Sequence, residues 1–359
     1  MRRPRQVIPL IAWMAAWLVA VAAHGPCRAA EGELDLLIRG GRVLDPETRL
    51  DAVRDVGIRD GTIVAIAADG LEAARAVIDA DGLVVAPGFI DLHAHGQNLE
   101  SSRFQAADGG TTALEMEIGV YPVADWYASR EGNAMIHYGA TVGHVAARVK
   151  VMHGIDVGHL GTSSLDERAK FADGDYARRA ASDEEIDALA ALLAEGLDEG
   201  ALGIGFGLAY TPKASHREIL RMFEVAADYG VTCFVHMRSG DTFTDAESIG
   251  PLQELIANAA TTGASLHVVH LNSSGGAQAK VALAAIRSGR EHGLDLTTES
   301  YPYTASSTTI QAPFFDGDWE GRSGLSYSDM VWVETGERLT RETFLEYRKR
   351  GGWVIVHGM

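Results

Sequence analysis

The sequence predicts an α/β protein in which a small β unit precedes a barrel of alternating strands and helices. Three observations favour this architecture. Residues 34–85 consist of short runs of alternating apolar and polar residues, separated by Gly-Gly and Asp-Gly turns. Pro87-Gly88 then interrupts this pattern. From residue 88 onward, short apolar runs alternate with amphipathic segments, which is typical of parallel βα units.

Length and composition suit a globular enzyme and not a disordered chain. The chain has 359 residues, of which 47% are hydrophobic and 22% charged, enough for one large α/β unit with a smaller companion. The formal net charge of −18 argues against nucleic acid or an anionic membrane surface as a partner. Nothing in the sequence indicates the oligomeric state.

Residues 1–29 have the pattern of a secretory signal peptide. A basic start precedes an apolar run over residues 7–23, and small residues occupy plausible cleavage positions up to Ala29. An uncleaved membrane anchor is the weaker alternative, because the apolar run is short for a full span. We expect export to the periplasm or beyond, without stable membrane association after cleavage. Cys233 would then be the single remaining cysteine, so we expect it in the core and no intrachain disulfide.

Residues 30–87 are expected to form the small, antiparallel β domain and residues 88–359 the barrel. The clearest helix begins after Ser182, has Glu185 in a capping box and ends before Gly200. An open doubly wound sheet is the alternative to a barrel, but no Gly-rich phosphate loop follows a strand. Residues 313–347 are expected to be a long excursion that ends in a helix, before a last apolar strand. The barrel strands are expected in GFIDLHAH, TTALEMEIG, AMIHYGATVGH, ALGIGFGLAY, VTCFVHMR, SLHVVHL and LDLTTESYPY.

Histidines at the ends of these strands predict a metal site. His93 and His95 are two residues apart at the end of the first strand, so they share a face. His236 and His270 end two later strands, and the carboxyl ends of barrel strands form the rim where active sites lie. His267 cannot face the same way as His270, three residues later, and is expected to be structural or exposed to solvent.

Two glutamates in the second strand need a positive partner. Glu115 and Glu117 point to the same face of an apolar strand, and burying an unpaired carboxylate costs several kcal/mol. Many binuclear barrel hydrolases bridge their metals with a carboxylated lysine, but residues 200–210 contain no lysine. Glu117 lies nearer the rim and is the better bridging ligand. For Glu115, orienting a histidine and forming a buried ion pair remain equal alternatives.

Several motifs resemble those of the N-acyl-D-amino-acid deacylases, or D-aminoacylases, of the amidohydrolase superfamily. These are PGFIDLHAH, GALGIGFGLAY, HMR, HLNSSGG and ESYPYTASSTT, and TTALEMEIGVYPVADWYASREG and HYGATVGHVAAR are similar to the N-acyl-D-glutamate deacylase branch. The resemblance implies a metal-dependent hydrolase (β/α)8 TIM-like barrel with a small β-sandwich-type domain. It carries the zinc ligands over to His93, His95, His236 and His270, for one tight site or for two. Typical members bridge with a cysteine where this chain has Glu-Met-Glu-Ile-Gly, so Glu117 is an inference from position.

The resemblance also implies zinc-dependent hydrolysis of the N-acyl amide bond of an N-acyl-D-amino acid, with N-acyl-D-glutamate as the expected substrate. The family's general-base aspartate follows an eighth strand, and we expect both beyond Met359, in a chain truncated at its C-terminus. Residues near strand ends are candidates for substrate contacts, with packing or loop bonding as the alternative. Two rival functions remain: another amidohydrolase of dihydroorotase, hydantoinase or dipeptidase type, and an inactive metal-binding remnant. The candidate substrate contacts are Arg148, Arg238, Asn272, Tyr301 and Tyr303.

Overall fold

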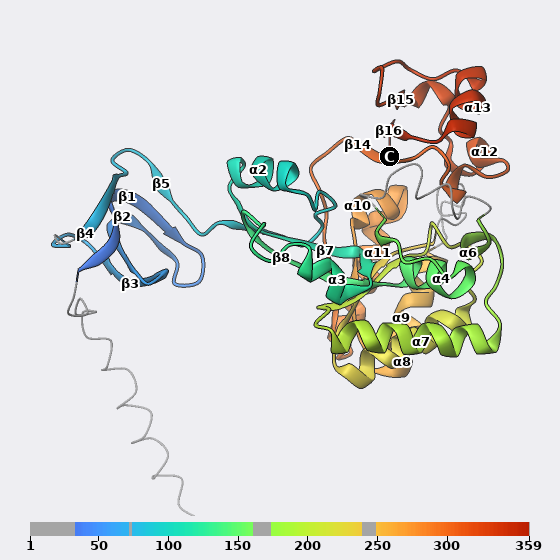
Figure 1. Ribbon diagram of the computed structural model, residues 1–359, viewed down its shortest axis with the longest axis horizontal. Helices are drawn as coiled ribbons and strands as arrows, with labels where there is room; N and C mark the ends of the chain where they lie inside the picture. Colours follow the sequence, from blue (N-terminus) through green and yellow to red (C-terminus); the bar gives the residue numbers. More distant parts are fainter. Residues whose placement is uncertain (1–32, 72–73, 161–173, 239–248, 359) are drawn as a thin grey trace, which may run out of the picture. The chain divides into compact units, whose positions relative to one another are not determined.

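A computed structural model describes residues 33–71, 74–160, 174–238 and 249–358 (Figure 1). The contacts divide the chain into two units, residues 1–88 and 89–359. The predicted signal peptide lies outside the described residues. Within the described ranges, no helix is long and apolar enough to span a membrane.

The first unit contains a five-stranded mixed sheet. Strands β1 and β2, and likewise β2 and β3, pair antiparallel as the alternating pattern predicted. However, β4 and β5 run parallel to β1, so the expectation of a purely antiparallel unit was wrong. Both strands pair directly with β1 and run in its direction, so neither is joined to it by a tight hairpin. The strands are β1 (Leu34–Asp45), β2 (Leu50–Arg59), β3 (Thr62–Ala67), β4 (Ala74–Asp79) and β5 (Val84–Val85).

The second unit is built on a curled, parallel half-barrel of the TIM-like kind, which confirms the predicted fold class. Its seven parallel strands follow the order β13-β12-β11-β10-β8-β7-β6, and each contains part of one predicted apolar run. The two-residue strand β9 (Gly158–His159) adds to β7 in the antiparallel sense. The parallel strands are β6 (Phe89–Asp91), β7 (Gly110–Tyr121), β8 (His137–Gly143), β10 (Gly203–Gly207), β11 (Thr232–His236), β12 (Ser265–Val268) and β13 (Leu296–Thr298).

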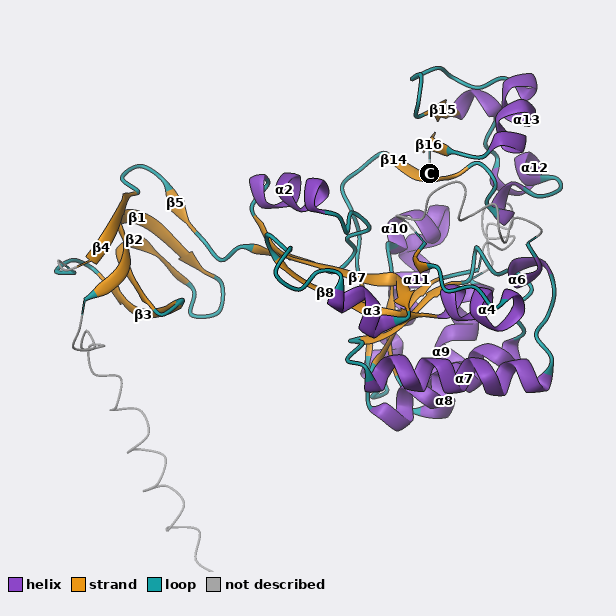
Figure 2. Cartoon of the chain, in the orientation of Figure 1, coloured by secondary structure: helices purple, strands orange, loops and turns teal. Residues whose placement is uncertain are grey.

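Most of the helices between residues 99 and 291 pack against strands of the half-barrel (Figure 2). In α7 the predicted capping box of Ser182 and Glu185 is present, and the apolar stripe is buried. Each fully buried leucine of such a stripe contributes about 1.5–3 kcal/mol. Cys233 is buried in the same core, as predicted. The helices are α2 (Leu99–Ala107), α3 (Val123–Ala128), α4 (His144–His153), α6 (Asp175–Arg178), α7 (Asp183–Asp198), α8 (His216–Tyr229), α9 (Gly250–Thr262), α10 (Leu271–Ser274), η3 (Gly276–Gln278) and α11 (Ala279–Glu291).

The last segment of the chain forms a three-stranded antiparallel sheet of its own. The predicted helix near its end is α13, but the final apolar strand, β16, pairs with β14 and β15 and adds nothing to the barrel sheet. An aromatic core that includes Phe315, Trp319 and Phe344 packs beneath this sheet. The elements are β14 (Ala305–Thr309), η4 (Pro313–Phe315), α12 (Trp319–Ser323), η5 (Tyr327–Asp329), β15 (Met330–Trp332), α13 (Arg341–Arg350) and β16 (Trp353–His357).

Candidate metal centre

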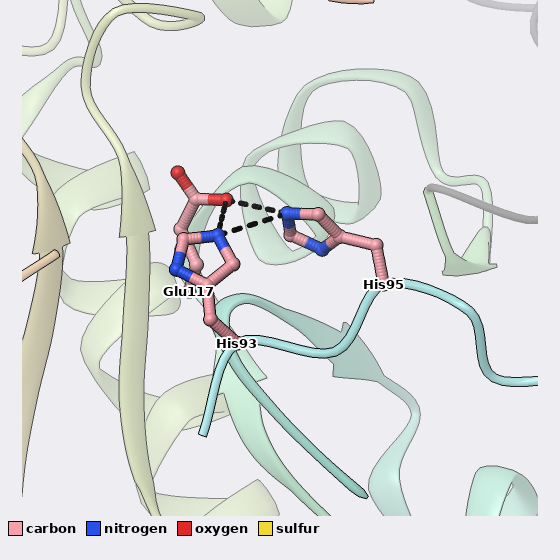
Figure 3. A group of neighbouring side chains, drawn as sticks. All are labelled: His93, His95 and Glu117. Atoms are coloured by element: carbon pink, nitrogen blue, oxygen red, sulfur yellow. Dashed lines mark hydrogen bonds and ion pairs between the residues drawn. The ribbon is translucent and has the colours of Figure 1, made fainter. Parts of the chain in front are cut away.

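The two histidines after β6 are positioned by strand β7. Although β6 ends before them, the backbone N–H of Ala94 donates to the carbonyl of Leu114 on β7 at 2.9 Å. This bond keeps the segment beside the sheet, with the Ala94 side chain buried. The alternation of side chains along an extended segment then turns His93 and His95 to the same side. Both rings face Glu117 (Figure 3).

Glu117 is the residue on which four imidazole rings converge. Its side chain is almost fully buried. Its Oε2 lies 3.0 Å from Nε2 of His93 and 2.8 Å from Nε2 of His95 (Figure 3). Its Oε1 lies 2.5 Å from Nδ1 of His236 and 3.1 Å from Nε2 of His270. Each carboxylate oxygen therefore serves one pair of histidines, as a ligand shared between two ions would.

His270 reaches the cluster through an unusual backbone conformation. Strand β12 ends at Val268, and His270 follows with φ 33° and ψ 54°, in the left-handed region. Residues with a Cβ rarely adopt this conformation, which costs roughly 1–2 kcal/mol. Its ring Nδ1 lies 2.7 Å from Oγ of Ser274, and its Nε2 faces Glu117. A strained residue held in place by its neighbours is common at functional sites.

Glu115 lies behind the cluster and holds His95. Its Oε2 lies 2.8 Å from Nδ1 of His95 and 2.6 Å from Nε2 of His159, and its Oε1 accepts the backbone N–H of Ile118 at 3.2 Å. A carboxylate that binds one ring nitrogen fixes the tautomer and leaves the other nitrogen for a metal. Of the two alternatives left open by the sequence, the geometry fits the orienting role. His159 was not predicted, because it lies in β9, and a strand of two residues has no recognisable sequence pattern.

Glu299 orients His93 in the same way, and the sequence analysis did not predict it. Its Oε1 lies 2.5 Å from Nδ1 of His93, and its Oε2 lies 3.5 Å from Nε2 of His267. His267 is buried and its Nδ1 lies 2.8 Å from Oγ1 of Thr297, so it is structural and not exposed to solvent. Its position in the sequence could have indicated Glu299, because it directly follows β13, at the same rim as the metal-ligand candidates.

The electrostatics of the cluster show why it suits a cation. Burial opposes the charge on Glu117, but His93 and His236 hold the pKa of its carboxyl well below the usual range. Burial also opposes protonation of His93, yet Glu117 and Glu299 raise the pKa of that ring to about 10. Around a carboxylate that stays charged, a divalent ion would supply the positive charge that protonated imidazoles otherwise supply.

The donors present fit zinc in chemistry and in spacing. Their ligand atoms form two groups, each with all atoms within 4.8 Å of one another, and Glu117 belongs to both. Imidazole nitrogens and carboxylate oxygens bind zinc at about 2.0–2.2 Å, so donors of one ion lie about 3–4 Å apart. A further group with the same spacing joins His95, Glu115 and His159, where Glu115 lies within hydrogen-bonding distance of both rings. The two groups that share Glu117 are His93, His95 and Glu117, and Glu117, His236 and His270.

Two cavities meet at this cluster. The first, of about 400 Å³, is lined by the metal-ligand candidates and by Tyr301, Tyr303 and Phe314. The second, of about 500 Å³, extends towards α6 and α13. A substrate bond held at the cluster would therefore have space on both sides. The residues that line both cavities are His95, Glu117, Tyr210, Ser307 and Thr308.

The structure does not bring Arg148 to either cavity. The sequence placed it near a strand end, but it lies one turn into α4 and is fully buried. Its guanidinium donates to Oε1 of Glu218 at 2.5 Å and to the carbonyls of Tyr176 and Arg179 at 2.6 and 2.8 Å. These bonds tie α4 to α8 and to the residues around α6, so Arg148 has a structural role in this fold.

The other four candidate substrate contacts lie near the cluster in different ways. Arg238 lines the first cavity, but its Nε and Nη2 form a bidentate pair with Glu254 at 2.8 and 3.1 Å. Asn272 exchanges hydrogen bonds with the backbone of Tyr301 at 3.0 and 3.3 Å and so holds that loop. Tyr301 and Tyr303 line the first cavity with their rings 6.0 Å apart.

Comparisons with known proteins agree on the family. The model of the amidohydrolase family matches residues 76–311. The N-acyl-D-glutamate deacylase of Alcaligenes xylosoxydans xylosoxydans is 28% identical over 312 residues, covering 77% of this chain and 59% of the relative. The dihydroorotase of Solibacter usitatus is 27% identical over 320 residues, covering 81% and 65%. The solved N-acyl-D-glutamate deacylase of Bordetella bronchiseptica, complexed with zinc and a phosphonate inhibitor, has a TM-score of 0.70 at 24% identity, covering 91% of this chain and 72% of that one.

The chain belongs to the amidohydrolase family, because the family model matches more than half of it. A solved D-aminoacylase, with a TM-score of 0.67 at 23% identity, shares the same fold. The chain spans 65% and 59% of the length of the two curated relatives. These relatives carry different names, deacylase and dihydroorotase, so the family rather than one substrate is common to them.

Proposed function

We propose that the protein is a zinc-dependent hydrolase of the N-acyl amide bond of N-acyl-D-amino acids, with N-acyl-D-glutamate as substrate. The observation that carries this proposal is the sharing of Glu117 between two pairs of histidines where two cavities meet. A substrate amide at the cluster can extend an acyl group to one side and an amino acid to the other. The motif resemblance and the likeness to N-acyl-D-glutamate deacylases support this choice of amide.

The zinc ligands in this proposal are His93, His95, Glu117, His236 and His270. Bound zinc would lower the pKa of a water ligand and polarise the amide carbonyl. The protein's own residues prepare for this: Glu117 keeps its negative charge while buried, and Glu115 and Glu299 hold two rings with Nε2 towards the site.

A hydrolase of cyclic amides is the second candidate, favoured by the match to a dihydroorotase. The hydantoinase type of bridge needs a lysine, and β10 is Gly-Ile-Gly-Phe-Gly. Glu117 instead lies between the histidine pairs. We therefore prefer the linear substrate.

An assay of the zinc-loaded chain separates the candidates. The proposal predicts an order of preference: N-acetyl-D-glutamate over its L enantiomer, with no hydrolysis of dihydroorotate or hydantoin. The matched control is Glu117→Gln, which keeps the size of the side chain and removes its charge, and should abolish the activity. Faster turnover of dihydroorotate would overturn the proposal in favour of the second candidate. Zinc binding without turnover of any of these compounds would favour the inactive remnant.

Export of the protein is part of the proposal and rests on residues 1–29 alone. Expression with this segment should deliver a shortened chain to the periplasm, and N-terminal sequencing should place its start near residue 30. A full-length chain that stays in the cytoplasm would refute export.

A further inference from the structure

The two cavities differ in the charges along their walls. The first is lined by the carboxylates of Asp91, Glu117 and Glu299 and by one guanidinium, which Glu254 already pairs. The second is lined by Arg178 and Arg348, and Glu117 is its one carboxylate among the described residues. In a chain with a formal net charge of −18, two cations in one cavity wall are a marked local excess of positive charge.

The two arginines come from distant segments and share one carboxylate. Arg178, at the end of α6, places Nε 2.9 Å from Oδ2 of Asp316. Arg348, in α13, pairs with Oδ1 of Asp316 and donates from Nη1 to the carbonyl of Phe315 at 2.6 Å. Partial burial opposes the charge on Asp316, but the two guanidinium groups lower the pKa of its carboxyl. Two positive charges against one negative charge leave a net positive charge at this wall.

Both guanidinium groups keep donors for a ligand. A guanidinium carries five N–H donors. Within the described part of the chain, Arg178 uses Nε and Nη2 and leaves Nη1 without a hydrogen bond. Arg348 uses its two terminal nitrogens and leaves its Nε without a hydrogen bond to any described residue. Their side chains are 41% and 24% exposed, whereas that of Arg148 is fully buried among its partners.

We propose that Arg178 and Arg348 bind a carboxylate of the substrate in the second cavity. The substrate class is then an anionic N-acyl amide, with its acid arm in the second cavity, its amide at Glu117 and its acyl group in the first cavity. The inference rests on the proposed function and adds two specificity-determining residues to it. Guanidinium groups suit this role because they are always charged and their N–H donors form charge-assisted hydrogen bonds with carboxylates.

The first cavity suits the acyl group for complementary reasons. Tyr301, Tyr303 and Phe314 offer aromatic surface there, which favours an uncharged arm. The carboxylates of Asp91 and Glu299 in the same wall would repel a second anion. The distribution of charge therefore sets the direction in which the substrate lies across the cluster.

The test compares the zinc-loaded chain with Arg178→Gln and Arg348→Gln on three compounds. These are N-acetyl-D-glutamate and its two monoamides, N-acetyl-D-glutamine and N-acetyl-D-isoglutamine, each of which lacks one carboxylate. We expect each variant to raise KM for the diacid by about 10- to 100-fold, the range for a charged hydrogen bond, with a much smaller change in kcat. For the monoamide that lacks the bound carboxylate, KM should change by about 2-fold or less. An equal rise in KM for all three compounds would overturn the inference.

Two further variants separate ligand binding from a structural role. Asp316→Asn keeps both guanidinium groups, so KM for the diacid should stay the same or fall. If the arginines only hold α6 to α13, Asp316→Asn would instead raise KM for the diacid as the arginine variants do. Arg217→Gln is the surface control: Arg217 pairs with Asp183 and lines neither cavity, so it should change KM for no compound.

Failure of the proposed function would be visible separately. If the zinc-loaded chain hydrolyses none of the three compounds, that function is wrong, and calorimetric titration with the same compounds then decides the inference. Tight binding of the diacid that both arginine substitutions weaken by about 10-fold or more would support it. No binding of the diacid, or binding that both variants retain, would overturn it.

Discussion

Glu115 and Glu117 lie on one face of β7 but have different partners. Glu117 places each of its oxygens near one pair of histidines. Glu115 lies one pleat deeper, fully buried, between His95 and His159. Charges on the surrounding rings lower the pKa of Glu115 to about 2 despite its burial. One residue is therefore placed to bind metal and the other to orient a ligand.

Replacing Glu115 by Gln should weaken zinc binding without abolishing it. A glutamine can keep one oxygen between His95 and His159, but its NH2 group then faces the Ile118 N–H that Oε1 of Glu115 accepts, and the negative charge that holds both rings is lost. Loss of such a partner typically costs 10- to 100-fold in metal affinity. Competition with a chromophoric chelator measures this change, with Glu224→Gln on the surface of α8 as the control. An unchanged zinc affinity would show that Glu115 does not orient His95.

Sequence reasoning located the metal-ligand candidates and offered Glu115 as an orienting residue, but it missed Glu299 and His159. His93, His95 and Glu117 stand out because alternation along a strand and a place at its carboxyl end are visible in the sequence. Glu299 and His159 act through contacts with segments far away in the chain. Such pairings depend on which elements meet in three dimensions, and local patterns do not contain that information.

At the scale of elements, β10 passes very close to the backbone of β7. A Cβ on Gly205 would lie 2.5 Å from the carbonyl oxygen of Glu117 and 2.4 Å from Oγ1 of Thr141. The carbonyl oxygen belongs to the main chain and cannot move aside in a packed sheet. The Thr141 side chain is fully buried and has no space to move into. The glycine therefore sets how close the Glu117 backbone lies to β10.

Gly205→Ala should displace Glu117 and lower zinc affinity by about 10-fold or more, by analogy with other losses of ligand support. The control is Gly289→Ala in α11, where the added methyl meets the end of the Leu296 side chain. That side chain can move, and alanine favours a helix. Chelator competition and thermal unfolding of both variants would check this. Equal zinc affinity in the two variants would contradict the role of Gly205.

A buried ionic cluster joins α4 to α8. Oε1 of Glu218 lies 2.5 Å from Nη1 of Arg148 and 2.8 Å from Nε2 of His144, and all three side chains are fully buried. Burial opposes the charge on Glu218, but these two partners lower the pKa of its carboxyl from 4.5 to about 2. Because its folded pKa is depressed, the stabilisation is present above about pH 4.5 and is lost as pH falls towards 2.

Glu218→Gln should reduce the free energy of unfolding by about 3 kcal/mol at pH 7, since it leaves Arg148 buried without a counter-charge. The difference in free energy of unfolding from the native chain should shrink as pH falls below about 4.5. Below that pH the native chain itself loses the stabilisation that the charged Glu218 provides. Urea unfolding at pH 7 and at pH 3.5 measures both values. A difference that stays constant over this range would refute the charged pair as its source.

In the whole molecule, periodicity predicted the barrel and the presence of the first β unit, but it missed part of that unit's strand pairing and the three-stranded sheet near the end of the chain. Seven apolar runs separated by helices indicate parallel strands, and all seven were found. The parallel pairing of β4 and β5 with β1 was missed because alternation does not specify strand direction. Strand β16 was expected as an apolar strand, but its pairing with β14 and β15 was not predicted, because β14 is Ala-Ser-Ser-Thr-Thr and β15 has only three residues.

In the proposed site, the fold assembles a metal centre around one shared carboxylate, Glu117. Elemental analysis of the purified, zinc-equilibrated chain beside Glu117→Gln shows whether this carboxylate holds zinc. We expect at least one zinc ion per native chain, and we expect the variant to lose most of it, while circular dichroism shows both chains folded. A folded Glu117→Gln chain that retained all its zinc would contradict the account.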